Sequence, residues 1–323
     1  MEPLQVVIDA SPLISDIHGW TRGFETLVVV KAFGVERNNF KEPPKRILAL
    51  GEMMEGRLSK AMGAMTALGA RFVAISVSFV SAQSASAADT TEPVPILVEL
   101  FTSEGCSSCP PADLLLQRMD ELQPVAGAHL IVLSEHVDYW DHDGWKDPYS
   151  SHLFTDRQSA YVAVLGLSTP YTPQMIVDGA SVLQNNNSQQ AEQVFRKVEA
   201  AQKVPVHINS IRVEGTTPPV LQARIEVGEN SDKHSADIYL AVALGHAESQ
   251  VLRGENSGHH LTHVAVVQSL TRIGKLEKGK SFSQDVQVKL QPGTDPANLR
   301  VIAFVQQTGP RQVLGAALGM VGR

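Results

Sequence analysis

A Cys-x-x-Cys pair between an apolar run and a helical pattern is the feature that most constrains this chain of 323 residues. Residues 96–101 are apolar and β-prone, and Cys106 and Cys109 follow them in a polar loop. Residues 114–122 then repeat apolar side chains at the spacing of one buried helix face. The cysteines are therefore expected at a helix N-terminus, where free N–H groups and the helix dipole stabilise a thiolate, the reactive form of cysteine.

Three other interpretations of the cysteine pair remain open. A structural disulfide across a two-residue spacer would close a small ring and gain little loop entropy. A zinc site would need further ligands, and the chain contains no third cysteine. Two inert thiols are the remaining alternative. If the pair is reactive, Ser107 and Ser108 can donate to the Cys106 sulfur, and Cys106 is expected to be the more exposed thiol, with Cys109 shielded by the helix.

The segment before the motif has the order of a secretory signal peptide. A basic region, an apolar region and a small-x-small cleavage site follow one another within residues 57–87. A membrane anchor is the alternative, but the uncharged apolar run is about half of the roughly 20 residues that a spanning helix needs. We therefore expect a secreted or periplasmic protein, and we interpret residues 1–56 as a non-native or disordered extension.

Residues 88–204 are expected to form an α/β domain. A second unbroken apolar run at residues 129–134 follows the first helix, and a strand–helix–strand unit of this length favours a parallel pair. Further helices are expected at residues 155–165 and 189–202. Sites in parallel sheets lie at the carboxyl ends of the strands, so the loop after the second strand should lie beside Cys106.

That loop combines aromatic and ionisable residues. His136, Asp138 and Trp140 alternate in it, so in an extended segment they would share one face. His136 is the candidate proton shuttle for the leaving thiol, supported by Asp138 and Trp140. A surface loop held by aromatic side chains is the alternative.

A threonine–proline step precedes the next short strand. Thr172 and Pro173 are followed by a turn signal at Asp178 and Gly179. A cis bond before Pro173 would expose backbone beside the cysteines, where an extended substrate could pair as an added strand. An ordinary trans turn is the alternative.

Residues 205–323 alternate apolar and polar side chains between turn signals, which predicts an all-β, sandwich-like domain. This region contains no cysteine, so we expect it to orient or select a partner rather than to carry the chemistry. His259, His260 and His263 could bind a metal, but a loop packed at the domain junction is the preferred interpretation.

Charge limits the possible partners. The formal net charge is -7, and the chain has no run rich in lysine or arginine, which argues against nucleic acid. No cofactor is expected, and a membrane would be contacted only through an uncleaved signal peptide.

Four stretches together carry a resemblance to a known family. They are residues 98–113 (VELFTSEGCSSCPPAD), residues 136–141 together with 144–148, residues 171–175 (YTPQM) and residues 253–256 (RGEN). Over about residues 95–320 the sequence resembles domain of unknown function 1223, an uncharacterised family of secreted bacterial proteins. The resemblance implies a thioredoxin-like α/β domain with a β extension, and little about the substrate.

The wider thioredoxin superfamily implies roles for individual residues. Cys106 resembles the attacking cysteine, Cys109 the resolving cysteine and Pro173 the cis-proline. Glu99 resembles the buried acid on the strand before the motif, although its spacing from Cys106 is one residue longer than in that pattern. These likenesses are expectations about roles.

The sequence therefore predicts an exported thiol–disulfide oxidoreductase acting on a protein or small-molecule thiol or disulfide. One alternative is a Cu(I)-binding or metal-delivery module, in which His136 or His142 completes a site with the two cysteines. The other is a non-catalytic interaction protein.

Overall fold

The computed structural model describes residues 92–183, 188–232 and 234–322. The predicted extension, residues 1–56, and the predicted signal peptide, residues 57–87, lie outside the described residues. None of the helices in the described part of the chain is both long and apolar enough to cross a membrane.

A strand, a helix and a second strand begin the fold. β1 (Val94–Thr102) and β2 (Ala128–His136) are parallel, with Val98 opposite Val132, and α1 (Pro110–Leu122) connects them. Parallel neighbours need such a crossover. The predicted parallel pair is confirmed.

Two more helices and a hairpin complete the first half of the chain. α2 (His152–Leu165) precedes the hairpin of β3 (Gln174–Val177) and β4 (Ser181–Leu183), and α3 (Ser188–Glu199) follows it. β3 is antiparallel to β1. The predicted turn is confirmed, with Asp178 in the left-handed region at φ 49.

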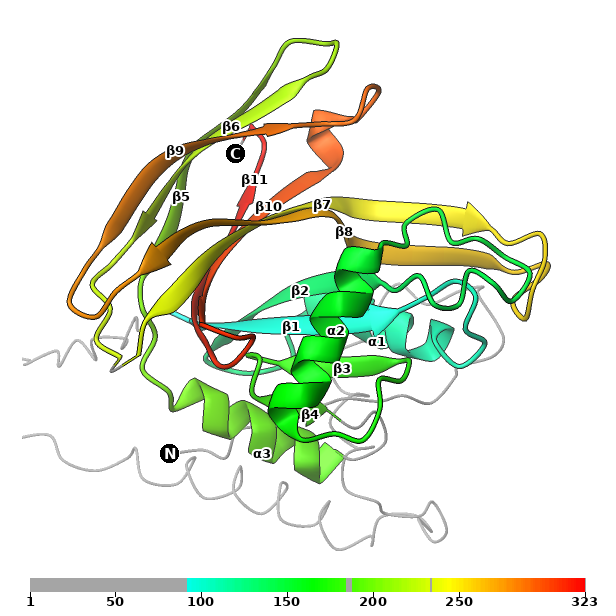
Figure 1. Ribbon diagram of the computed structural model, residues 1–323, viewed down its shortest axis with the longest axis horizontal. Helices are drawn as coiled ribbons and strands as arrows, with labels where there is room; N and C mark the ends of the chain where they lie inside the picture. Colours follow the sequence, from blue (N-terminus) through cyan, green and yellow to red (C-terminus); the bar gives the residue numbers. More distant parts are fainter. Residues whose placement is uncertain (1–91, 184–187, 233, 323) are drawn as a thin grey trace, which may run out of the picture. The chain divides into compact units, whose positions relative to one another are not determined.

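The second half of the chain consists of strands and one short 3-10 turn. Its elements are β5 (Val206–Glu214), β6 (Val220–Val227), β7 (Ala236–Gln250), β8 (His260–Leu276), β9 (Phe282–Lys289), η2 (Pro296–Asn298), β10 (Leu299–Gln307) and β11 (Val313–Met320). The predicted strands are confirmed, but β7 and β8 are longer than predicted. They form a long hairpin with its tip at residues 251–259 (Figure 1).

The strands pair differently from the prediction. An eight-stranded mixed sheet has the order β11-β10-β7-β8-β2-β1-β3-β4, and β5-β6-β9 form a second sheet. Strands from both sides of residue 204 thus share one sheet. With eleven strands and three α-helices among the described residues, the predicted α/β thioredoxin-like domain followed by an all-β sandwich-like domain is wrong.

Strand periodicity explains this error. Alternation shows which side of a strand is buried, but it does not show which other strand pairs with it in the sheet. Here β8 lies parallel to β2, with Ser134 opposite Val266. This pairing joins the two halves of the chain.

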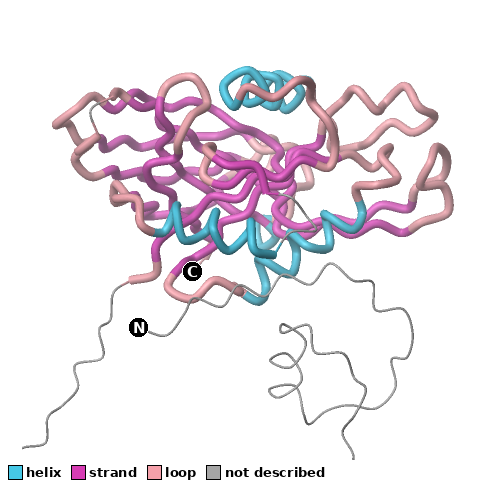
Figure 2. The backbone as a smooth tube through the Cα atoms, turned by 90° about the horizontal axis from the view of Figure 1, so that it is seen from below, coloured by secondary structure: helices cyan, strands magenta, loops and turns pink. Residues whose placement is uncertain are grey.

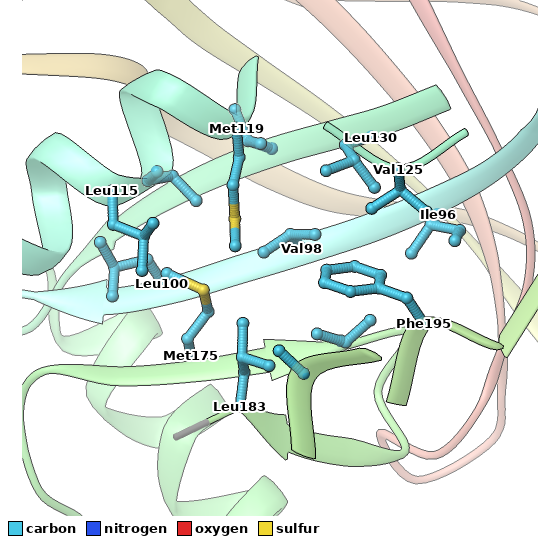
Figure 3. Packing of buried hydrophobic residues seen from close by; sticks show 14 of the residues in the cluster. Ile96, Val98, Leu100, Leu115, Met119, Val125, Leu130, Met175, Leu183 and Phe195 are labelled. Carbon is cyan, nitrogen blue, oxygen red and sulfur yellow. The ribbon is translucent and has the colours of Figure 1, made fainter. Parts of the chain in front are cut away.

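The large sheet is covered on both faces. Ile96, Val98 and Leu100 of β1 pack in the buried cluster that includes α1 and α3 (Figure 3). Leu97 and Phe101 point to the opposite face, into the cluster that includes α2. Figure 2 shows helices on both sides of the strands. A third cluster packs β5, β6 and β9 against β7 and β10.

Buried charges lie on the α2 face. Glu99, between Leu97 and Phe101, accepts a 2.8 Å hydrogen bond from Arg157 Nε and a 2.5 Å bond from the Tyr161 hydroxyl. Arg157 Nε also lies 3.4 Å from Glu135 Oε1. Burial raises the pKa of Glu135 well above its usual value, with Arg157 opposing and Glu99 adding to the rise. One guanidinium therefore faces two buried carboxyl groups, and the raised pKa of Glu135 favours its neutral form.

Arg157→Ala is expected to lower the free energy of unfolding by about 3–5 kcal/mol, because it leaves the carboxyl groups of Glu99 and Glu135 buried without their cation. Urea unfolding measures this loss. Arg212→Ala is the control, since Arg212 pairs with Glu214 at the surface and should change stability by less than about 1 kcal/mol. Equal losses in the two variants would contradict the assignment.

Candidate functional site

The loop between β1 and α1, residues 103–109, holds the cysteine pair. Cys106 and Cys109 form a disulfide, with their Cα atoms 5.4 Å apart. Cys109 is the N-cap residue of α1, and prolines occupy the first two helical positions, as the sequence predicts. Both cysteines are fully buried in this disulfide form, and the expectation that Cys106 is the more exposed thiol stays a prediction for the reduced protein.

Hydrogen bonds within the loop connect the two cysteines with Ser108 and with the start of α1. Ser108 Oγ lies 3.3 Å from Cys106 Sγ, as predicted for a spacer hydroxyl. Cys109 N–H donates to the Cys106 carbonyl, and the Cys109 carbonyl accepts from the N–H groups of Ala112 and Asp113. Both serine residues are exposed, so the loop lies at the surface although its sulfur atoms do not.

The tip of the β7–β8 hairpin binds this loop. Asn256 Nδ2 donates to the carbonyls of Glu104 (2.8 Å) and Cys106 (3.0 Å), and Glu255 Oε2 accepts from Ser107 N–H (3.1 Å). The sequence had placed no group from residues 205–323 near Cys106. The structure brings two there, because β7 and β8 extend beyond the predicted strands.

Two loops meet beside the cysteines: residues 137–151, called here the tryptophan loop, and residues 166–173, called the proline loop. Trp140 Nε1 donates a 2.7 Å hydrogen bond to Thr172 Oγ1. A Cβ atom added to Gly105 would lie 3.0 Å from Trp140 Cβ, so glycine permits this close approach. The peptide bond between Thr172 and Pro173 is cis. The predicted residues Trp140, Thr172 and Pro173 therefore lie in adjoining loops around the motif.

A buried histidine on β8 lies between a carboxyl group of the cysteine loop and one of α1. His263 Nε2 lies 3.3 Å from Glu104 Oε1, and His263 Nδ1 lies 3.8 Å from Asp113 Oδ1. Although burial opposes the charge, the two carboxylates raise the pKa of His263 to about 10. Glu104 also accepts a 2.8 Å bond from Trp145 Nε1. His263 is thus an imidazolium that neutralises buried carboxylates around the loop.

His136 belongs to the same buried network. Its Nδ1 lies 2.7 Å from Asp147 Oδ2, which also accepts from Glu104 N–H at 2.8 Å. Burial opposes the charge of Asp147, but His136 and backbone N–H groups lower its pKa. The rings of His136 and His263 are 4.8 Å apart. His136 Nε2 has no hydrogen-bond partner among the described residues, and the proton-shuttle role of His136 stays a prediction.

The other predicted site residues point elsewhere. β2 ends at His136, so the extended segment expected to align His136, Asp138 and Trp140 does not continue. Asp138 accepts a 2.6 Å bond from Thr155 Oγ1 at the start of α2. Burial opposes its charge, but Thr155 and His152 lower the pKa of Asp138. Glu99 lies on the α2 face of the sheet, opposite the face that α1 covers. The roles proposed for these residues stay predictions.

No cluster of three histidine, cysteine, aspartate or glutamate side chains among the described residues has a geometry suited to a metal ion. His260 instead pairs with Glu248 at the surface, and His259 Nδ1 lies 3.1 Å from the Asn256 carbonyl. The site residues to which the sequence assigned no role beside the cysteines are Glu104, Asp113, Asp147, Glu255, Asn256 and His263. Only the long-range pairing of β8 with β2 brings the last three to the loop.

Asn256→Ala is expected to lower the free energy of unfolding by about 1–3 kcal/mol, because two buried carbonyls lose their donor. Chemical denaturation of the oxidised protein measures the loss. Gln250→Ala removes one exposed amide bond from the same hairpin, and its effect should stay within about 0.5 kcal/mol. An unchanged midpoint for Asn256→Ala would mean that the tip does not hold the loop.

His263→Gln is expected to destabilise the protein by about 2–4 kcal/mol at pH 7, because the imidazolium of the folded state is lost. The pKa of His263 is raised by folding, so its contribution is complete below pH 6.5 and disappears as the pH rises through about 10. Unfolding of both proteins at several pH values between 6 and 10.5 measures the difference. A difference that stays constant over this range would contradict the charge assigned to His263.

Comparison with known proteins places these features in a family. The model of a family described as "Protein of unknown function (DUF1223)" matches residues 97–306. A search of curated proteins finds no match. The crystal structure of protein AGR_C_4864 from Agrobacterium tumefaciens is similar, with 26% identity and a TM-score of 0.54 over 72% of this chain and 96% of that chain.

A second solved structure, HBP35 of Porphyromonas gingivalis, has 15% identity and a TM-score of 0.51, over 72% of this chain and 76% of that chain. At this identity the likeness concerns the fold alone. The residues that the family model matches include both cysteines and the hairpin tip that binds their loop.

Proposed function

The chain belongs to the DUF1223 family of proteins of unknown function, and from its site we propose that it is a thiol–disulfide oxidoreductase acting through Cys106 and Cys109. The observation that carries the proposal is the disulfide at the first turn of α1, in a surface loop where three other segments converge. A pair closed across two residues adds little chain constraint, so a purely structural role explains little of this arrangement.

The chemistry follows from the two sulfur atoms. In the reduced protein, the Cys106 thiolate attacks a substrate disulfide, forms a mixed disulfide and releases one substrate thiolate. The Cys109 thiolate then attacks Cys106 Sγ, releases the second substrate thiolate and forms the Cys106–Cys109 bond. Two electrons pass from the protein to the substrate, and the reverse sequence oxidises a substrate dithiol.

The surroundings of the loop support this order of attack. Cys109 is the N-cap residue of α1 and its carbonyl accepts from the first helical turn, whereas Cys106 precedes the helix and adjoins the exposed Ser107. Tyr171, which precedes Thr172, is 46% exposed. A substrate strand is therefore expected to approach over Ser107 and the segment before Pro173.

We also propose that the protein works outside the cytoplasm. The support is the signal-peptide pattern of residues 57–87, because exported proteins meet the oxidising conditions in which disulfide exchange is useful. The substrate is a protein or small-molecule thiol or disulfide.

Cys106→Ser is expected to abolish reduction of a model disulfide such as insulin, and Cys109→Ser is expected to accumulate a mixed disulfide with the substrate, because the resolving thiol is missing. Turnover and intact mass of the adducts measure these outcomes. Full activity in Cys106→Ser, or adducts formed only through Cys109, would overturn the assignment.

A further inference from the structure

The N–H groups that can stabilise a Cys106 thiolate are few. Pro110 and Pro111 at the start of α1 have no N–H, and Cys109 N–H is bonded to the Cys106 carbonyl. The backbone donors of the spacer are those of Ser107 and Ser108. This differs from an open helix N-terminus, at which several free N–H groups can face an anion.

One of the two spacer donors is occupied by a carboxylate. Glu255 Oε2 accepts from Ser107 N–H at 3.1 Å, and the Ser107 side chain together with this N–H lowers the pKa of Glu255, so its carboxyl group is ionised at neutral pH. Asn256, the next residue, holds the tip in place through its bonds to the Glu104 and Cys106 carbonyls. The negative charge of Glu255 is thereby fixed at the residue that adjoins Cys106.

We propose that Glu255 is a positioning residue that opposes formation of the Cys106 thiolate, and so shifts the cysteine pair toward its disulfide form. The inference rests on the proposed thiol chemistry and adds the group that tunes it. A like charge disfavours ionisation, and a carboxylate on Ser107 N–H takes a donor that would otherwise face the sulfur.

The other ionisable groups near the loop are buried and contact one another. They come from the loop, α1, the tryptophan loop, β2 and β8, and they are Glu104, Asp113, Asp147, His136 and His263. His263 lies between the carboxylates of Glu104 and Asp113, and His136 lies against Asp147. Glu255, in contrast, is an exposed carboxylate whose described hydrogen bond is to a neutral amide.

Glu255→Gln tests this role, because an amide oxygen can still accept from Ser107 N–H while the charge is removed. In a Cys109→Ser background, alkylation of Cys106 by iodoacetamide at pH 7 is expected to become about three- to tenfold faster. The pH profile should show a lower pKa for Cys106. High salt should shrink the difference, since the charge is exposed to solvent.

Equilibration with glutathione gives a second measurement on the full chain with both cysteines. Two glutathione molecules reduce the Cys106–Cys109 bond and become one glutathione disulfide, so two electrons and two protons are exchanged. Stabilising the thiolate stabilises the reduced pair. Glu255→Gln should therefore raise the equilibrium constant for reduction of the protein by about three- to tenfold.

Glu121→Gln is the matched control. It removes the same charge from α1 at its far end, where Glu121 accepts from Gln117. Unchanged or slower alkylation in Glu255→Gln, or an equal acceleration in Glu121→Gln, would overturn the proposal. Neither assay needs a substrate protein, so a wild-type chain that fails to reduce insulin would refute the oxidoreductase proposal without deciding the role of Glu255.

Discussion

β8 lies parallel to β2, with Ser134 opposite Val266, and the arrangement around the cysteines depends on this pairing. It adds four strands of the second half of the chain to the sheet that β1–β4 form. It carries His263 into the space between Glu104 and Asp113, and it directs the hairpin tip onto the cysteine loop. The β-rich half is therefore part of the site that surrounds the disulfide.

Two buried networks each place one cation against two carboxyl groups. On the α2 face, Arg157 contacts Glu99 and Glu135; on the α1 side, His263 lies between two carboxylates. A buried ion is tolerated when a partner offsets its desolvation. Each cation is supplied by an element remote in sequence from at least one of its acids, so each network connects distant parts of the chain.

Local patterns predicted local structure well. The helix after Cys109, the parallel β1–β2 pair and the alternating strands from Val206 onward all follow from periodicity and turn residues. The same patterns could not predict that β8 pairs with β2, since a strand's sequence does not specify which strand lies beside it. For that reason the cysteine motif was found from sequence, while the contacts that Glu255, Asn256 and His263 make around it were not. Asp138 was misplaced for another reason: the chain turns away after β2 ends at His136.

A reversible cysteine pair and a structural disulfide differ most directly in reduction potential. Equilibrating the purified full chain with glutathione redox buffers, and counting free thiols by mass after acid quenching and alkylation, gives this value for Cys106–Cys109. The oxidoreductase proposal predicts a potential between about −270 and −120 mV, the range spanned by dithiol oxidoreductases. A potential below about −300 mV, where structural disulfides of secreted proteins lie, would contradict it.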